Sequence, residues 1–224
     1  HEMEALTRDD ALAWYRRYYA PNDAVLVVAG DVDPAEVERL ARQYYGPLAP
    51  TADLTPRQRV TEPPQLAERR LRMEDARVQR PYVLRSYLAP ERNAGDQVRA
   101  AALTMLADLL GGNAATSVLG RALVFDSKQA IYASAGYDGL SLDATTFTLV
   151  VVPAEGVGLG EAEAAMDAAL AKFLHDGPDP AQFQRIRTEI GAGEIYARDN
   201  VQGLTRRYGE ALTSGLTIAD VQGW

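Results

Sequence analysis

The chain has 224 residues, of which 47% are apolar and 24% are charged, and its formal net charge is −8. These proportions exclude collagen-like, coiled-coil and wholly disordered chains. The longest apolar runs, residues 24–30 and 148–152, are much shorter than the roughly 18 residues that a membrane-spanning helix needs. We therefore expect an ordinary globular chain, folded as one domain or as parts of two, with no membrane span.

Histidine and cysteine are too scarce for a complete metal or nucleophilic site. The chain has no cysteine and only two histidines, His1 and His175, which lie far apart in the sequence. This excludes disulfides and thiolate zinc sites, and it leaves neither histidine with a second one nearby for a catalytic dyad or a compact zinc site. We interpret His175 as a residue at the C-terminal end of a helix. We expect no catalytic residue and no metal ligand within this chain.

The N-terminal part of the sequence predicts a helix, a strand and a second helix. Thr7 and Asp10 have the spacing of a capping box, and Pro21 ends the helix that they begin. The continuous apolar run over residues 24–30 predicts a strand covered on both faces. An Asp-Pro pair then begins a helix over residues 33–44, which carries a stripe of apolar side chains at helical spacing.

Four prolines mark a connection to a second folded unit. They lie within residues 49–67, where no helical or alternating pattern is sustained, and we interpret this stretch as a linker. The region around it is locally basic, because residues 57–99 contain ten arginines and six acids. We favour a solvated connector and strand surface for this basic segment and keep anion binding as the alternative.

After the linker, the pattern predicts the element order β-β-α-α-β-β-α-α-α. Strands are expected over residues 69–74, 81–88, 131–137 and 145–152, and helices over residues 96–110, 116–125, 161–174, 179–195 and about 201–212. Because neighbouring strands are joined in hairpin-like fashion, we expect an α+β fold, with a mainly antiparallel sheet covered by helices. A doubly wound parallel sheet is the less favoured arrangement.

Two features of the N-terminal part occur together. The motif Tyr19-Ala20-Pro21-Asn22 ends the first predicted helix, and Gly30-Asp31-Val32 closes the apolar strand that follows. This combination resembles the insulinase or pitrilysin-type zinc metallopeptidases, in which a helix ending in Tyr-x-Pro-Asn leads into a strand closed by Gly-Asp-Val. Later segments are similar to the so-called inactive domain of that family, namely residues 109–112, 116–117, 121–124 and 134–137.

The resemblance covers nearly the whole chain and implies the family's repeated α+β domain. Residues 1–48 would be the C-terminal end of the zinc-bearing domain, residues 49–67 the linker, and residues 68–224 most of the inactive domain. We therefore interpret the chain as a fragment of a longer protein.

The zinc site of the family does not match any part of this sequence. The family holds zinc with an H-x-x-E-H motif on a helix, whose glutamate activates the bound water. His1-Glu2-Met3-Glu4 lacks the second histidine of that motif. The resemblance thus implies zinc in the full-length parent and none in this fragment.

An arginine and a tyrosine at a fixed spacing hold the substrate in this family. Matching on residues 134–137 puts Val124 and Ile131 at these positions, and a shift by one residue puts Phe125 and Tyr132 there. Neither register supplies the arginine. We therefore expect a partner subunit that carries the arginine-tyrosine pair, or a homodimer.

A short glycine turn is the one candidate for substrate binding. Gly111, Gly112 and Asn113 occupy the place where the partner subunit of the processing peptidases carries a long, substrate-contacting glycine-rich loop. Two glycines after an apolar helix more often form a C-cap, because glycine adopts the left-handed conformation without steric cost. We favour the C-cap and keep substrate contact as the alternative.

Three functions remain for this chain. The first is the non-catalytic wall of a chamber that encloses peptides or unfolded proteins in a zinc metalloendopeptidase, and the fragment alone would then be inactive. The second is a non-proteolytic scaffold homologue, comparable to a core subunit of a respiratory complex. The third is a stand-alone anion-binding module built on the basic segment. We expect a bacterial protein that does not bind nucleic acid, and we favour the periplasm over the cytoplasm.

Overall fold

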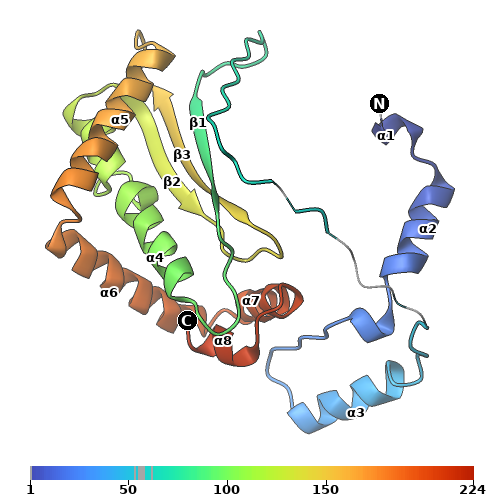
Figure 1. The fold of residues 1–224 in the computed structure, drawn as a ribbon. Helices are drawn as coiled ribbons and strands as arrows, with labels where there is room; N and C mark the ends of the chain where they lie inside the picture. Colours follow the sequence, from blue (N-terminus) through green and yellow to red (C-terminus); the bar gives the residue numbers. More distant parts are fainter. Residues whose placement is uncertain (1, 53, 55–58, 62) are drawn as a thin grey trace.

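The computed structural model describes residues 2–52, 54, 59–61 and 63–224. In these residues, a three-stranded antiparallel sheet forms the centre of the second unit (Figure 1). Its strands are β1 (Val83–Ala89), β2 (Ala130–Tyr137) and β3 (Thr145–Pro153), and β3 lies between the other two. The predicted α+β fold with an antiparallel sheet is confirmed.

Helices cover one face of this sheet. Figure 1 shows α4 and α5 on the same side of the strands, and the two π-helical turns also pack against β2. The helical elements of the second unit are α4 (Val98–Ala107), η2 (Asp108–Gly112), η3 (Gly120–Asp126), α5 (Leu159–Asp176), α6 (Pro180–Ala197), α7 (Val201–Thr213) and α8 (Ile218–Gln222).

Alternation along β3 explains why only one face is covered. Phe147, Leu149 and Val151 are buried against the helices, whereas Thr148 and Val150 between them point to the other side and are partly exposed. Successive side chains of a strand point to opposite faces, so the alternate buried positions define a single core layer. The helical side of this core includes Leu119, Leu123 and Met166.

The N-terminal part forms α1 (Glu2–Ala5), α2 (Arg8–Tyr18), η1 (Pro21–Asp23) and α3 (Pro34–Tyr44), which lie apart from the sheet (Figure 1). The capping box is confirmed: the Thr7 hydroxyl accepts from the Asp10 amide at 3.2 Å, and the Asp10 carboxylate accepts from the Thr7 amide at 2.8 Å. Neither α2 nor α3 has a buried residue, so the described chain covers their apolar side chains at most in part.

Two predicted strands are wrong. Residues 24–30 and 69–74 are extended or irregular but belong to no sheet in the described part of the chain. A strand is stable only where a neighbour completes its hydrogen bonds, and no described segment does so here. Leu71 is accordingly 91% exposed, and Val25, Leu26 and Val28 are also exposed.

The glycine pair after α4 does not form the expected left-handed C-cap. Neither Gly111 nor Gly112 has a positive φ, and the chain instead widens into the π-helical turn η2. A Cβ atom on Gly111 would lie 1.9 Å from the amide nitrogen of Ala135. Glycine is needed here because the backbone of η2 lies directly against β2, with no room for a side chain.

A buried glutamine holds α6 against this turn. The side-chain amide of Gln182 donates to the carbonyl oxygens of Leu109 at 3.2 Å and Thr116 at 2.9 Å. π-Helical and irregular backbone leaves carbonyl groups without their usual helical partners, and a buried carbonyl must find another donor. Gln182 therefore satisfies the two sides of the glycine turn at once.

An ion-pair hub fixes the segment before β1 on α5. Glu163 of α5 accepts hydrogen bonds from Arg70 at 2.8 and 2.9 Å and from Arg85 of β1 at 3.0 Å, and Arg85 also pairs with Asp167. The pKa of Glu163 is lowered from its ordinary 4.5 to about 2. The hydrogen bonds from Arg70 are the larger cause, and the hydrogen bond from Arg85 is the smaller one. The carboxylate is only 15% exposed, so water screens these contacts less than surface pairs.

We expect Gly111→Ala to lower the free energy of unfolding by about 1–3 kcal/mol, because the new methyl group forces η2 away from β2. Gly112→Ala is the matched control, since a Cβ atom there would meet only the flexible side chain of Asp108. Urea unfolding followed by circular dichroism measures both. Equal stability of the two variants would contradict the close backbone contact.

Glu163→Gln should change the acid limb of the stability curve. A carboxylate with a depressed folded pKa stabilises the fold above its unfolded pKa, and that stabilisation is lost as pH falls from about 4.5 towards about 2. The variant should be less stable than the wild type at pH 6, and the difference should shrink at pH 3. Glu161→Gln removes the same charge from an exposed position of α5 and should cost less stability at pH 6 than Glu163→Gln. A difference between Glu163→Gln and the wild type that stays constant with pH would count against the hub.

Candidate substrate-facing surface

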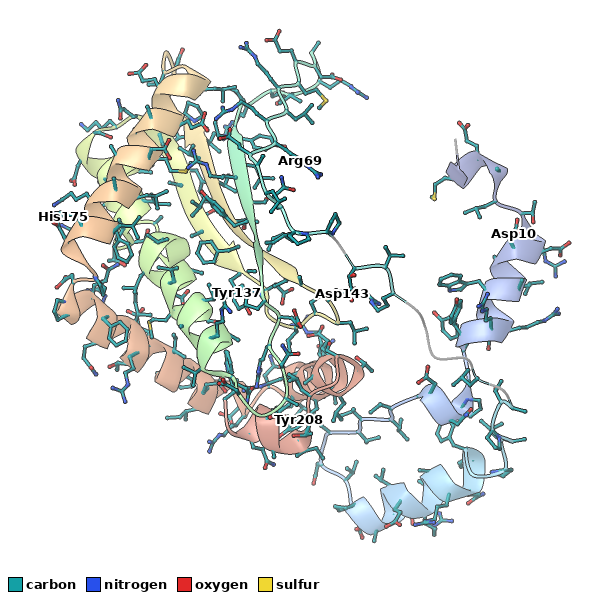
Figure 2. All side chains as sticks on the ribbon, in the orientation of Figure 1. Asp10, Arg69, Tyr137, Asp143, His175 and Tyr208 are labelled. Atoms are coloured by element: carbon teal, nitrogen blue, oxygen red, sulfur yellow. The ribbon has the colours of Figure 1, made fainter. Side chains whose placement is uncertain are left out.

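The described residues contain no group of three or more His, Cys, Asp or Glu side chains that could hold a metal ion. His175 lies in the last turn of α5, as predicted, with its side chain 88% exposed and facing away from the sheet (Figure 2). Its Nδ1 atom lies 2.7 Å from a carboxylate oxygen of Asp176. His1 falls outside the described residues. The described part also has no helix that is both long and apolar enough to cross a membrane.

The three predicted substrate-binding residues differ in their access to solvent. Gly111 is buried against β2, whereas Gly112 and Asn113 are exposed. The Asn113 side-chain oxygen accepts from the amide of Ala115 at 2.9 Å, which fixes the turn after η2. A substrate could therefore reach only Gly112 and Asn113, and their contact with substrate stays a prediction.

The positions matched to the arginine-tyrosine pair lie on η3 and at the start of β2. Phe125 is 53% exposed and Tyr132 is 49% exposed, while Val124 packs against the core. The shifted register, with Phe125 and Tyr132, thus gives two surface aromatics. Neither Val124 nor Phe125 has a guanidinium group, so neither register supplies the arginine.

Five of the nine described arginines of the basic segment form ion pairs within the chain. Each arginine that pairs does so with an acid of the same segment or of a nearby element: Arg59 with Asp143, Arg70 with Glu68 and Glu163, Arg72 with Glu74, Arg77 with Asp75, and Arg85 with Glu163 and Asp167. Arg57 lies outside the described residues. These pairs favour the connector interpretation of this segment over anion binding.

Within the part of the chain that the structure describes, no helix covers the other face of the sheet, which we call the open face. Its members alternate with the buried core positions of the three strands and lie opposite one another in the strand register. They are Leu84, Ser86, Leu88, Tyr132, Ser134, Gly136, Thr146, Thr148, Val150 and Val152. None of these side chains is charged.

Small residues form a row across the middle of the open face. Ser86 and Gly136 both lie opposite Thr148 in the register, on β1 and β2 respectively. The Thr148 hydroxyl donates to the carbonyl oxygen of Gly136 at 3.4 Å. The next row across the sheet consists of Leu84, Val150 and Ser134.

A groove of about 650 Å³ lies between the N-terminal segment and α7. Its walls are residues 25–27 on one side and polar or small residues of α7 and its N-cap on the other, including Asn200, Gly203 and Arg206. The groove is open and mixed in character, and no set of convergent catalytic groups lines it.

A buried arginine that the sequence did not indicate anchors the C-terminal helix. Arg92 is only 7% exposed; it donates to the carbonyl oxygen of Asp220 at 2.7 Å and to the side chain of Gln97. Its guanidinium carbon lies 3.9 Å from the ring centroid of Trp224, which is cation–π geometry. Burial of the guanidinium group lowers the pKa of Arg92, and the positive charge of Arg207 lowers it further. The cluster attaches α8 to the loop after β1 and is structural.

Neither Arg92 nor Gln182 belongs to a local pattern. Each binds groups that are far away in sequence, and a single sequence carries no signal for such contacts. A glutamine at a position that is otherwise apolar by helical spacing is the only hint that Gln182 offers.

Comparison with solved structures identifies similar folds. A protease from Helicobacter pylori superposes with a TM-score of 0.87 at 23% identity, over 99% of this chain and 52% of that one. A putative M16-like peptidase from Alicyclobacillus acidocaldarius gives a TM-score of 0.70 at 24% identity, over 98% of this chain and 52% of that one. The periplasmic protease PqqL from Escherichia coli gives 0.71 at 18% identity, over 97% of this chain and 24% of that one.

The chain therefore spans about half the length of the first two structures and about a quarter of the third. Comparison with curated protein sequences gives no significant match. The family model described as the peptidase M16 inactive domain matches residues 5–190, which is most of the chain. The chain thus belongs to the peptidase M16 inactive domain family, the non-catalytic part of metallopeptidase-type proteins.

Proposed function

We propose that this chain forms the non-catalytic wall of a peptide-enclosing chamber in a zinc metalloendopeptidase. The observation that carries the proposal is the open face: a three-stranded sheet packed by helices on one side only, with uncharged side chains on the other. Membership of the inactive-domain family supports the assignment to a peptidase.

The N-terminal part supports the existence of a second sheet in the intact protein. Residues 24–30 form an extended apolar segment whose Val25, Leu26 and Val28 are exposed. Such a run becomes stable when it is a strand between two others. We infer that residues 1–48 complete the zinc-bearing domain, that residues 49–67 link it to residues 68–224, and that zinc is bound by the other part of the parent.

The substrate would be a peptide or an unfolded protein. Extended chains can add to the edge of a sheet or lie along it. The length of an unfolded chain, and not a folded shape, would limit its entry into the chamber. Because neither register of the matched positions supplies an arginine, a partner subunit or a second copy would supply the arginine that holds the substrate. Gly112 and Asn113 are exposed at the end of η2, which packs against β2, and could add a contact.

The test is zinc content and peptide cleavage in two preparations. We expect the intact protein to hold about one zinc ion per chain after dialysis and to cleave an unfolded fluorogenic peptide, and we expect chelation with 1,10-phenanthroline to abolish cleavage. The 224-residue chain alone should hold no zinc and cleave nothing. Elemental analysis and fluorescence measure these outcomes.

Two results would contradict the proposal. Stoichiometric zinc bound by the isolated chain would show that the metal site lies in this chain and not in the other part of the parent protein. An intact protein that folds but binds no zinc and cleaves no peptide would instead support the scaffold homologue.

A further inference from the structure

We propose that the ion pair between Arg59 and Asp143 is a releasable latch, which limits how far the N-terminal part of the chain can move from the second unit. Arg59 belongs to the connector, the stretch between the N-terminal part and β1, and Asp143 belongs to the loop that joins β2 and β3. The inference goes beyond the proposed chamber and does not depend on it, because it concerns only contacts within this chain.

Three side-chain contacts hold the connector at successive points. The Asn22 side chain binds the backbone of Thr51 in both directions: its oxygen accepts from the Thr51 amide at 3.0 Å, and its amide donates to the Thr51 carbonyl oxygen at 3.4 Å. Arg59 Nε then donates to Asp143 at 2.6 Å, and the hub holds the connector again at Arg70. The first contact ties the connector to the N-terminal part, and the other two tie it to the second unit.

The described connector between Arg59 and Arg70 has no buried residue. Residues 59–61 and 63–70 are all exposed, with Val60 at 94% and Leu66 at 92%. These described residues form no backbone–backbone hydrogen bond and belong to no helix or strand. Loss of the ion pair at Arg59 would therefore free this stretch of the chain as far as the hub.

The loop that carries Asp143 is held in place independently of Arg59. The Asp143 amide donates to the Ser141 hydroxyl at 3.4 Å, and Leu140 packs against the small apolar cluster formed by α7, α8 and the turn between them. Figure 2 shows Asp143 on the side of the second unit that faces the connector. The carboxylate therefore stays in position when the arginine leaves, and the contact can form again.

The latch is the weaker of the two ties to the second unit. Both contacts of the Arg59 guanidinium go to one oxygen of Asp143, and the two side chains are each 36% exposed. Although Arg70 is itself 64% exposed, it binds both oxygens of Glu163, which is 15% exposed and stands on the long helix α5. Bidentate pairs are stronger than single contacts, and salt screens pairs that water reaches. Rising salt should therefore release Arg59 before Arg70.

Release of the latch would more than double the reach of the N-terminal part. Thr51 and Arg59 are eight positions apart in the sequence, and Thr51 and Arg70 are nineteen positions apart. An extended chain covers at most about 3.5 Å per residue, so the longest possible span rises from about 28 Å to about 66 Å. Packing adds little restraint, because α2 and α3 have no buried residue and an open groove lies between residues 25–27 and α7.

The experiment measures the distance between the two parts by double electron–electron resonance in the intact protein. Spin labels are attached at Ala13→Cys on α2 and Ala171→Cys on α5, which are exposed positions in a chain without cysteine. Any cysteine elsewhere in the protein is replaced by serine.

Two variants remove the latch, and a third is their matched control. Arg59→Gln and Asp143→Asn each remove one charge of the pair. Glu74→Gln removes a charge whose ion-pair partner, Arg72, lies in the same connector, so this pair ties nothing to the second unit. Arg59→Asp combined with Asp143→Arg exchanges the two charges and should form the latch again.

We expect a narrow distance distribution for the wild type in about 50 mM salt and a distribution about twofold broader for each latch variant. In about 1 M salt the wild type should approach the variants, because the Debye length falls to about 3 Å. The double variant Arg59→Gln with Asp143→Asn should be no broader than either single variant, since all three lose the same contact. Glu74→Gln and the charge exchange should stay as narrow as the wild type.

Three results would overturn the inference. They are equal distributions in the wild type and both latch variants, a wild-type distribution that is already broad at low salt, and a double variant that is broader than either single one. Circular dichroism shows whether each variant is folded, and the exposed change Arg59→Gln decides if Asp143→Asn is not. Zinc content and peptide cleavage are measured separately, so the latch and the proposed peptidase function can fail independently.

Discussion

The side-chain alternation of β3 is the constraint on which the rest of the structure depends. This strand is central, so its buried positions Phe147, Leu149 and Val151 set the register of both neighbours. A shift of one residue would turn the apolar set towards water and destroy the core. The same alternation leaves Thr148 and Val150 on the opposite face. One strand therefore determines both which side the helices cover and which side stays open.

Four different interactions keep the helical layer on its side of the sheet. At Gly111 the backbones of η2 and β2 are in direct contact, because there is no side chain between them. Gln182 binds carbonyl groups on both sides of the glycine turn, and Glu163 joins α5 to β1 through charge. Arg92 attaches the C-terminal helix to the loop after β1. None of these contacts uses the open face.

Local signals in the sequence predicted most of the fold. The capping box at Thr7, the longer helices and the three strands that pair with each other all follow from spacing and alternation. The short helices α1 and α8 were not predicted. Residues 24–30 and 69–74 have strand composition but no neighbour in the described chain, and composition cannot reveal a missing neighbour. The π-helical turns and the contacts of Gln182 and Arg92 were not predicted because they arise from tertiary packing. For the candidate site, the sequence indicated the glycine turn. It did not indicate that glycine is needed at Gly111 because the backbones of η2 and β2 are in contact there.

The most direct test of the account is the accessibility of the open face in the intact protein. Hydroxyl-radical footprinting with mass spectrometry reports it residue by residue, with Phe147 of the core as the buried reference. We predict that Leu84, Leu88 and Tyr132 are oxidised in the free protein and become protected when an unfolded peptide is added. Protection of these three residues in the free protein would show that another part of the molecule covers this face, and would contradict the account.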